Sequence, residues 1–321
     1  MQIQKCVLTL VAALGLCGWA HAQDYPAKPV KVVMPFPAGG GFDIVARIVA
    51  KGLSEQTGQP FVVENRPGAG GTIGADVVAR SAPDGYTLGF LTSGPLANNK
   101  LLYKNMPYDA DKAFAPIVLV GEIPLVFVAH PGVPVKNLTE YIQYARSNPG
   151  KGTVGHAGNG TIGHLALELL KFEAKANVLS VAYKGEAPAL ADVLGGAIQA
   201  ASAPIAAFVP HIQAGRLTPL AIAAGARFPA LPQVATAREQ GFDVEASVWA
   251  AVVAPAGTPG PILNRLNREV NAVLASQEVR DKLQQLGVVA IGGAASRVTE
   301  RTSTDTTKWK RVIEAANITI E

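Results

Sequence analysis

The chain has 321 residues, enough for two lobes of ordinary size, and carries a formal net charge of +4. Its basic residues are scattered along the sequence rather than gathered into one stripe, which argues against a nucleic-acid-binding protein. Both cysteines, Cys6 and Cys17, lie within the first 22 residues, so the remainder can form neither a disulfide nor a thiolate metal site.

The N-terminus has the pattern of a cleaved secretory signal. Lys5 precedes the apolar stretch Val7 to Trp19, and Ala20-His21-Ala22 then forms an A-x-A cleavage site. We therefore expect residues 1–22 to be removed after Ala22. Lipid attachment at Cys17 is less favoured, because Leu16 stands where a small residue is needed. No later apolar run is long enough to span a bilayer, so we expect a soluble mature protein.

A glycine turn follows the first predicted strand. The stretch PFPAGGGFD, residues 35–43, lies between the apolar run Val30–Met34 and a helical pattern that begins at Ile44. Glycines leave backbone N–H groups uncovered at the start of a helix, where the dipole also favours an anion. The alternative is that the glycines only permit a tight turn.

Short apolar runs and helical patterns then alternate, which predicts an α/β fold with mainly parallel sheets. The stretch from Leu263 to Leu286 and the stretch from Val298 to Ala316 are predicted to be amphipathic helices near the end of the chain. The predicted strands are Phe61–Val63, Tyr86–Leu91, Ile117–Val120, Leu125–Ala129, Leu179–Ala182, Leu217–Ala224 and Trp249–Ala254.

A second glycine turn, HAGNGTIGH at residues 156–164, separates the predicted strand 152–157 from another helical pattern. Thr161 is a good candidate for the helix N-cap, with His164 three positions later. Alone, this pattern is also explained by a capped helix with a packing histidine. If the two turns belong to different lobes, each offers a helix N-terminus to one cleft, and a small anion could bind between them.

The sequence lacks the motifs that the common enzyme classes require. The best alternative is a dinucleotide site, because Glu64 ends the second strand as a ribose-binding acid would, but Ile44 stands at the third glycine position. There is no G-x-S-x-G, H-E-x-x-H or phosphate-loop lysine motif. The four histidines outside the signal are too dispersed to predict a metal site: His130, His156, His164 and His211. We therefore expect no catalysis, no cofactor and no metal.

Six stretches together resemble the Bug family, the extracytoplasmic solute receptors of tripartite tricarboxylate transporters. In chain order they are YPAKPVKVVMPFPAGGGFDIVAR, FVVENRPGAGGTIGADVVARSAPDGYTL, GNGTIGHLALELL, YKGEAPALADVLGGAIQ, HIQAGRLTPLAIAA and APAGTP. The resemblance implies an α/β, two-lobed, Venus-flytrap (type II-like) periplasmic binding protein with its ligand cleft between the lobes. Lobe 1 would comprise residues 23–123 and 226–321, and lobe 2 residues 124–225, with candidate hinges near Gly121–Pro124 and after Leu217–Ala224.

The same resemblance implies the function. The protein would be a periplasmic monomer that binds a small carboxylate or amide-like solute and delivers it to a membrane permease; the alternative is a sensor that signals to a membrane partner. The implied ligand-binding residues are Phe36, Gly39, Gly40, Gly41 and Asp43 in the first loop, Gly158, Asn159, Gly160, Thr161 and His164 in the facing loop, Ser93, and Trp249 as a wall of the cleft.

Asp43 has two explanations at this stage. A carboxylate in the first turn of a helix is favoured by the dipole and by Arg47 four residues later, without any ligand. Alternatively, Asp43 accepts a hydrogen bond from an ammonium, an amide N–H or a bridging water on the solute, while the glycine N–H groups take the anion.

Overall fold

The computed structural model describes residues 25–39, 41–183 and 185–318. The predicted signal peptide lies outside the described residues. The strands form one connected sheet in the order β2-β1-β3-β9-β4-β7-β5-β6, and β8 and β10 also pair with β4. Their bounds are β1 Val30–Met34, β2 Phe61–Asn65, β3 Thr87–Thr92, β4 Phe114–Ala129, β5 Thr153–His156, β6 Leu179–Ala182, β7 Ala200–Pro204, β8 Thr218–Ala223, β9 Ser247–Pro255 and β10 Val289–Ala290.

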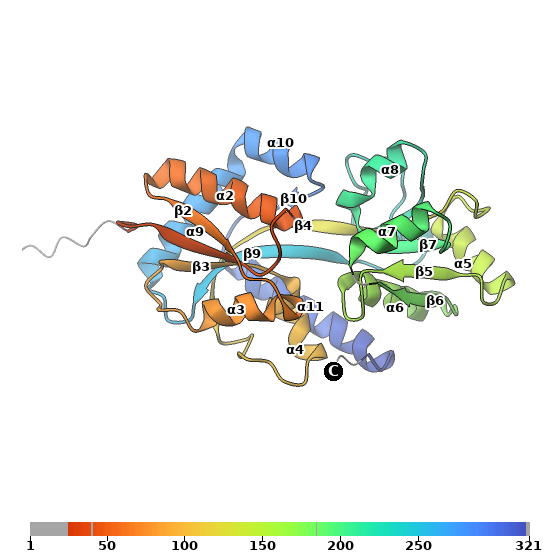
Figure 1. Cartoon of the computed structure of the whole chain (residues 1–321), viewed down its shortest axis with the longest axis horizontal. Helices are drawn as coiled ribbons and strands as arrows, with labels where there is room; N and C mark the ends of the chain where they lie inside the picture. Colours follow the sequence, from red (N-terminus) through yellow and green to blue (C-terminus); the bar gives the residue numbers. More distant parts are fainter. Residues whose placement is uncertain (1–24, 40, 184, 319–321) are drawn as a thin grey trace, which may run out of the picture.

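The α/β class is confirmed, but the prediction of mainly parallel sheets is wrong. Strands β2-β1-β3 at one end and β7-β5-β6 at the other are parallel, whereas every pairing made by β4 or β9 is antiparallel. The reason is that the two long central strands, β4 and β9, run antiparallel to each other and to their other neighbours. Helices cover each parallel group, as parallel strands require (Figure 1).

Strand β4 joins the two halves of the sheet. Residues 114–124 pair with β9, and from Leu125 onward the partners are β7 and β8. The predicted strands Ile117–Val120 and Leu125–Ala129 are therefore parts of one 16-residue strand. Below, "first half" means β1–β3, β9, β10 and their helices, and "second half" means β5–β8 and their helices (Figure 1).

The segment 226–246 packs against the second half, although the resemblance places it in lobe 1. Within it, the side-chain oxygen of Gln240 accepts a hydrogen bond from the backbone N–H of Leu138, at 2.8 Å. The backbone N–H of Ala246 donates to the carbonyl of Ala223, at 2.9 Å. The predicted lobe boundaries and hinges stay predictions.

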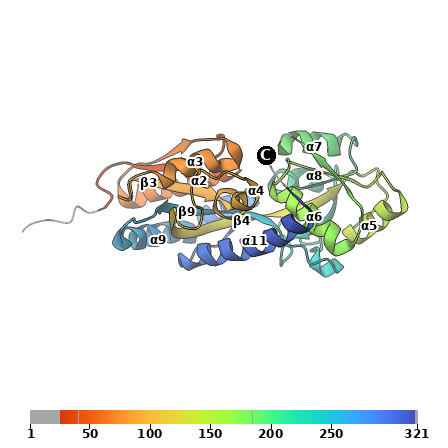
Figure 2. The same cartoon turned by 90° about the horizontal axis from the view of Figure 1, so that it is seen from below.

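Helices flank both halves. Those of the first half are α2 (Gly41–Thr57), α3 (Thr72–Ala79), α9 (Gly260–Ala275) and α10 (Gln277–Gln285); those of the second are α5 (Leu138–Ser147), α6 (Ile162–Ala174), α7 (Glu186–Leu194) and α8 (Val209–Gln213). The predicted helix 263–286 is thus broken at Ser276, whose backbone is extended. The last helix, α11 (Ser296–Ala315), confirms the prediction and runs along the sheet to α6 (Figure 2).

Two short helices, η2 (Gly94–Asn98) and α4 (Asn99–Leu102), follow the carboxyl end of β3. Within the described ranges, no helix combines the length and apolar character needed to cross a membrane.

Candidate functional site

A cavity of about 250 Å³ lies between the two halves, and we call it the central cavity. It meets the carboxyl end of β3, the loop between β5 and α6, and β7, in agreement with the rule that α/β proteins bind ligands beyond the carboxyl ends of strands. Its lining residues are Phe36, Gly70, Thr92, Ser93, Gly94, Asn98, Asn99, Leu102 and Tyr103 from the first half, Ala157, Asn159, Gly160, Thr161, Ile162, Gly163, Glu186, Ser202 and Pro204 from the second, and Val248 of β9.

The loop before α6 is held by its own side chains. The hydroxyl of Thr161 donates to the carbonyl of Gly158 at 2.7 Å and accepts the backbone N–H of His164 at 3.4 Å, so the predicted N-cap is confirmed. The N–H of Gly160 donates to the ring Nδ1 of His164, at 3.0 Å. These bonds fix the start of α6 at the cavity wall, where its first backbone N–H groups and its dipole favour an anion.

Close backbone packing brings α6 to this position. A Cβ on Gly163 would lie only 2.5 Å from the carbonyl oxygen of Ser202 on β7. Real Cβ atoms do not approach backbone oxygens so closely, and therefore only glycine lets the first turn of α6 rest against the sheet here.

His164 contacts the loop rather than the cavity. It is 8% exposed, is not among the lining residues, and its ring stacks on that of the fully buried His156 with centroids 4.6 Å apart. The ring Nε2 of His156 lies 2.7 Å from the hydroxyl oxygen of Ser180. Burial lowers the pKa of both rings to about 4, with a further contribution to His156 from its neighbour His164. Both rings are therefore neutral near pH 7.

Of the described residues in the first predicted loop, only Phe36 lines the cavity. Gly41 begins α2, and the N–H of Gly39 donates to a carboxylate oxygen of Asp43 at 2.9 Å. Neither glycine lines the cavity, and Gly40 lies outside the described residues. The N–H of Gly39 is therefore occupied by a protein acceptor.

Asp43 is also occupied by protein partners. It is 1% exposed, and besides Gly39 it accepts hydrogen bonds from Arg47 at 3.0 and 3.2 Å and from the amide of Asn65 at 2.7 Å. Burial alone would raise the pKa of this carboxyl, but the hydrogen bonds from its donors outweigh burial and lower it. This geometry supports the explanation in which Asp43 stabilises the start of α2.

Trp249 lies in the core and not in the cavity wall. Its side chain is fully buried, and the indole N–H donates to a carboxylate oxygen of Asp305 at 2.7 Å. Gly158 also lies outside the lining. Of the predicted residues, the structure brings together at the cavity Phe36, Ser93, Asn159, Gly160 and Thr161.

The sequence analysis missed most of the lining residues, among them the polar side chains of Asn98, Glu186 and Ser202. They come from η2, α7 and β7. Glu186 lies in one of the six stretches that carry the family resemblance, but no pattern in the sequence marks Asn98 or Ser202. None of the described lining residues is Lys, Arg or His, and Glu186 is the lining's one carboxylate. Burial raises the pKa of Glu186 to about 7. Among the residues described, no group of three or more His, Cys, Asp or Glu could hold a metal ion.

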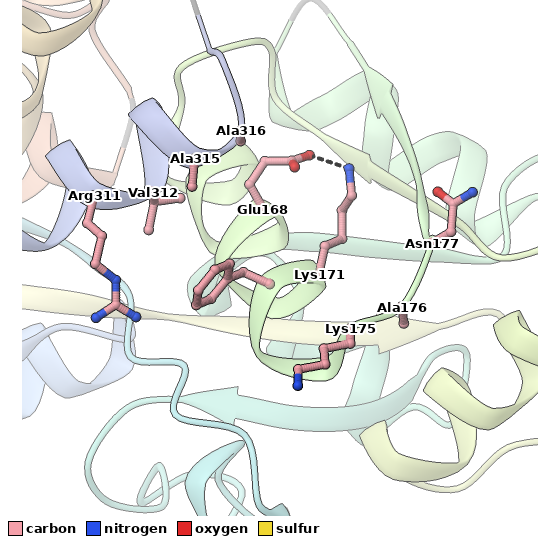
Figure 3. Close-up of a pocket in the computed structure, with 10 residues that line it drawn as sticks. Glu168, Lys171, Lys175, Ala176, Asn177, Arg311, Val312, Ala315 and Ala316 are labelled. Atoms are coloured by element: carbon pink, nitrogen blue, oxygen red, sulfur yellow. Dashed lines mark hydrogen bonds and ion pairs between the residues drawn. The ribbon is translucent and has the colours of Figure 1, made fainter.

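A second cavity, of about 390 Å³, lies between α6 and the end of α11 (Figure 3). Three of its four charged lining side chains form ion pairs: Lys171 with Glu168 at 2.9 Å, and Arg311 with Glu173 at 3.8 Å. None of the residues predicted to bind a ligand lines this cavity, whereas five of them line the central cavity. The central cavity is therefore the candidate site.

We expect the free energy of unfolding to fall as the pH drops from about 6.5 to about 4. The unfolded chain takes up protons on His156 and His164 with ordinary pKa values, whereas the folded chain holds both pKa values near 4. The stability that comes from keeping both histidines neutral is fully present above pH 6.5. Below that pH, each histidine changes the free energy of unfolding by up to about 1.4 kcal/mol per pH unit. Glu186 acts in the opposite sense, because its raised pKa gives a contribution that is lost as the pH rises from about 4.5 to about 7.

Comparing wild type with His164→Gln separates one histidine from these other groups. Urea unfolding at half-unit steps between pH 4.5 and 7 should give a slope that is shallower by about 1 kcal/mol per pH unit in the variant. Parallel stability curves for the two proteins would show that folding does not lower the pKa of His164.

Comparison with known proteins identifies the family and the fold of this chain. Residues 45–318 match the model of a family described as the tripartite tricarboxylate transporter family receptor. Protein BugT of Bordetella pertussis is 35% identical over 305 residues, which cover 94% of each chain.

Two solved structures with bound ligands are also similar. Rpa4515 of R. palustris, solved with adipate, has a TM-score of 0.83 and 35% identity over 92% of this chain and 100% of that chain. MatC (Rpa3494) of Rhodopseudomonas palustris, solved with malate, has a TM-score of 0.77 and 33% identity over 90% of this chain and 100% of that chain. Periplasmic binding protein BugD has a TM-score of 0.78 and 32% identity over 92% of this chain and 100% of its own. The predicted periplasmic binding protein fold is confirmed.

Proposed function

Because the chain belongs to the tripartite tricarboxylate transporter receptor family, we propose that it binds a small carboxylate or amide-like solute in the central cavity and delivers it to a membrane permease. The family and its solved members are periplasmic solute-binding receptors and not enzymes. Export through a signal peptide cleaved after Ala22, and action as a monomer, belong to the same proposal.

One observation carries the choice of ligand class. The first turn of α6, at Ile162 and Gly163, lines the cavity together with the loop residues Asn159 and Gly160. Backbone N–H groups at a helix N-terminus have no partner within the helix and bind carboxylates without any cationic side chain. This suits a lining whose described residues include no Lys, Arg or His. That two similar proteins were solved with adipate and with malate supports the same class.

A thermal-shift screen tests the proposal. The purified protein is heated with dicarboxylates from succinate to adipate, malate, tricarboxylates, acidic amino acids and aromatic monocarboxylates, with sodium chloride at matched ionic strength as the control. A ligand present at one hundred times its Kd adds about 2.7 kcal/mol of stability, which gives a clear rise in Tm. The absence of a shift with every carboxylate would contradict the proposal.

A further inference from the structure

Three buried oxygen atoms without a hydrogen-bond partner meet at the central cavity. They are Oδ1 of Asn98, Oγ of Ser202 and Oε1 of Glu186. Asn98 is 3% exposed and Ser202 is fully buried. A buried polar atom left unpaired costs about 1–3 kcal/mol, and native proteins rarely keep several together without a function.

The three residues belong to helices and a strand from both halves of the fold. Asn98 ends η2 in the first half, whereas Ser202 lies on β7 and Glu186 begins α7 in the second half. The start of α7 is tied to the loop before α6, because the N–H of Gly185 donates to the carbonyl of Ala157 at 3.1 Å. This hydrogen bond places Glu186 beside the loop that carries the start of α6.

Their chemistry is complementary to that of the α6 N-terminus. A carboxylate oxygen and an amide oxygen accept hydrogen bonds, and a serine hydroxyl can also accept. The start of α6 offers N–H donors instead. Backbone N–H groups on one wall of the cavity can thus donate hydrogen bonds, and side-chain oxygens on another wall can accept them. A ligand that satisfies both walls needs a carboxylate at one end and a hydrogen-bond donor elsewhere.

We propose that Asn98, Ser202 and Glu186 form an acceptor subsite that selects carboxylate solutes bearing a donor group, with an ammonium preferred over a hydroxyl. The preference follows because only an ammonium also neutralises the buried Glu186 carboxylate, which none of the described lining residues does. This inference rests on the proposed function, and it assigns to Glu186 the contact that the sequence analysis considered for Asp43.

The test uses matched ligands that differ only in the donor group. Calorimetry measures the affinity of wild type and Glu186→Gln for succinate, malate and aspartate, and for the longer pairs glutarate with glutamate and adipate with 2-aminoadipate. For the chain length that binds best, we expect wild type to bind the amino form at least tenfold more tightly than the plain dicarboxylate. Glu186→Gln should lose most of this preference while its affinity for the plain dicarboxylate changes less than threefold.

The control variant is Glu314→Gln, which removes an exposed carboxylate of α11 far from the cavity lining and should bind like wild type. Equal preference for amino and plain forms in wild type would overturn the subsite but leave the carboxylate receptor standing. So would an unchanged preference for the amino form in Glu186→Gln, because that result would mean that Glu186 does not contact the ammonium. Failure of every carboxylate to bind wild type would overturn the proposed function itself.

Discussion

Gly160→Val should weaken solute binding at least a hundredfold while the protein remains folded. Gly160 lines the central cavity and has a backbone φ of 74°, in the left-handed region that valine resists. An isopropyl group here would compete for space at a cavity of about 250 Å³ and displace the loop that carries the start of α6. The backbone strain costs about 1–3 kcal/mol, which a domain of ordinary stability tolerates.

The expected loss of affinity is at least a hundredfold, or about 2.7 kcal/mol, out of roughly 8 kcal/mol for a micromolar complex. Calorimetry with a ligand found in the thermal-shift screen measures the loss, and circular dichroism checks the fold. Gly215→Val is the matched control, because Gly215 has a similar φ of 69° but is exposed and has open space where a Cβ would point. If Gly160→Val binds within threefold of wild type, the loop before α6 is not part of the site.

Local patterns in the sequence were sufficient for most of the strands, several helices and one side of the site. The cap at Thr161 and the helix that follows it depend on residues only three or four positions apart, and these are visible in the sequence. The glycine loop before α6 was identified for the same reason. The resemblance of six ordered stretches then supplied the family-level fold.

Contacts between distant segments could not be predicted in this way. Strand β4 appears in the sequence as two apolar runs because Gly121 and Pro124 interrupt the pattern, yet pairing with β9 on one side and β7 on the other makes it continuous. Asp43 and Asn65 are 22 positions apart, so the hydrogen bond that occupies Asp43 could not be foreseen. Likewise, Asn98, Glu186 and Ser202 face one cavity only because the sheet brings η2, α7 and β7 together.

Trp249 gives the sharpest contrast between a structural role and a binding role. Its side chain is fully buried on β9, in a core cluster with Leu91 and Leu96, and its indole N–H donates to the buried carboxylate of Asp305. Asp305 in turn lies 3.3 Å from Arg301. Trp249 thus ties the central strand to α11, and this linkage contributes to stability irrespective of any solute.

Trp249→Ala should therefore lower the free energy of unfolding by about 3–5 kcal/mol, because it removes a large buried aromatic side chain and leaves a cavity. Trp249→Phe retains much of the packing but loses the hydrogen bond to the Asp305 carboxylate, for which we expect about 1.5–3 kcal/mol. Urea unfolding followed by far-ultraviolet circular dichroism measures both losses without relying on tryptophan fluorescence. Solute affinity of the folded Trp249→Phe protein should stay within threefold of wild type, since Trp249 does not line the central cavity. A Phe variant of unchanged stability that no longer binds the solute would instead place Trp249 in the binding site, as the family resemblance implies.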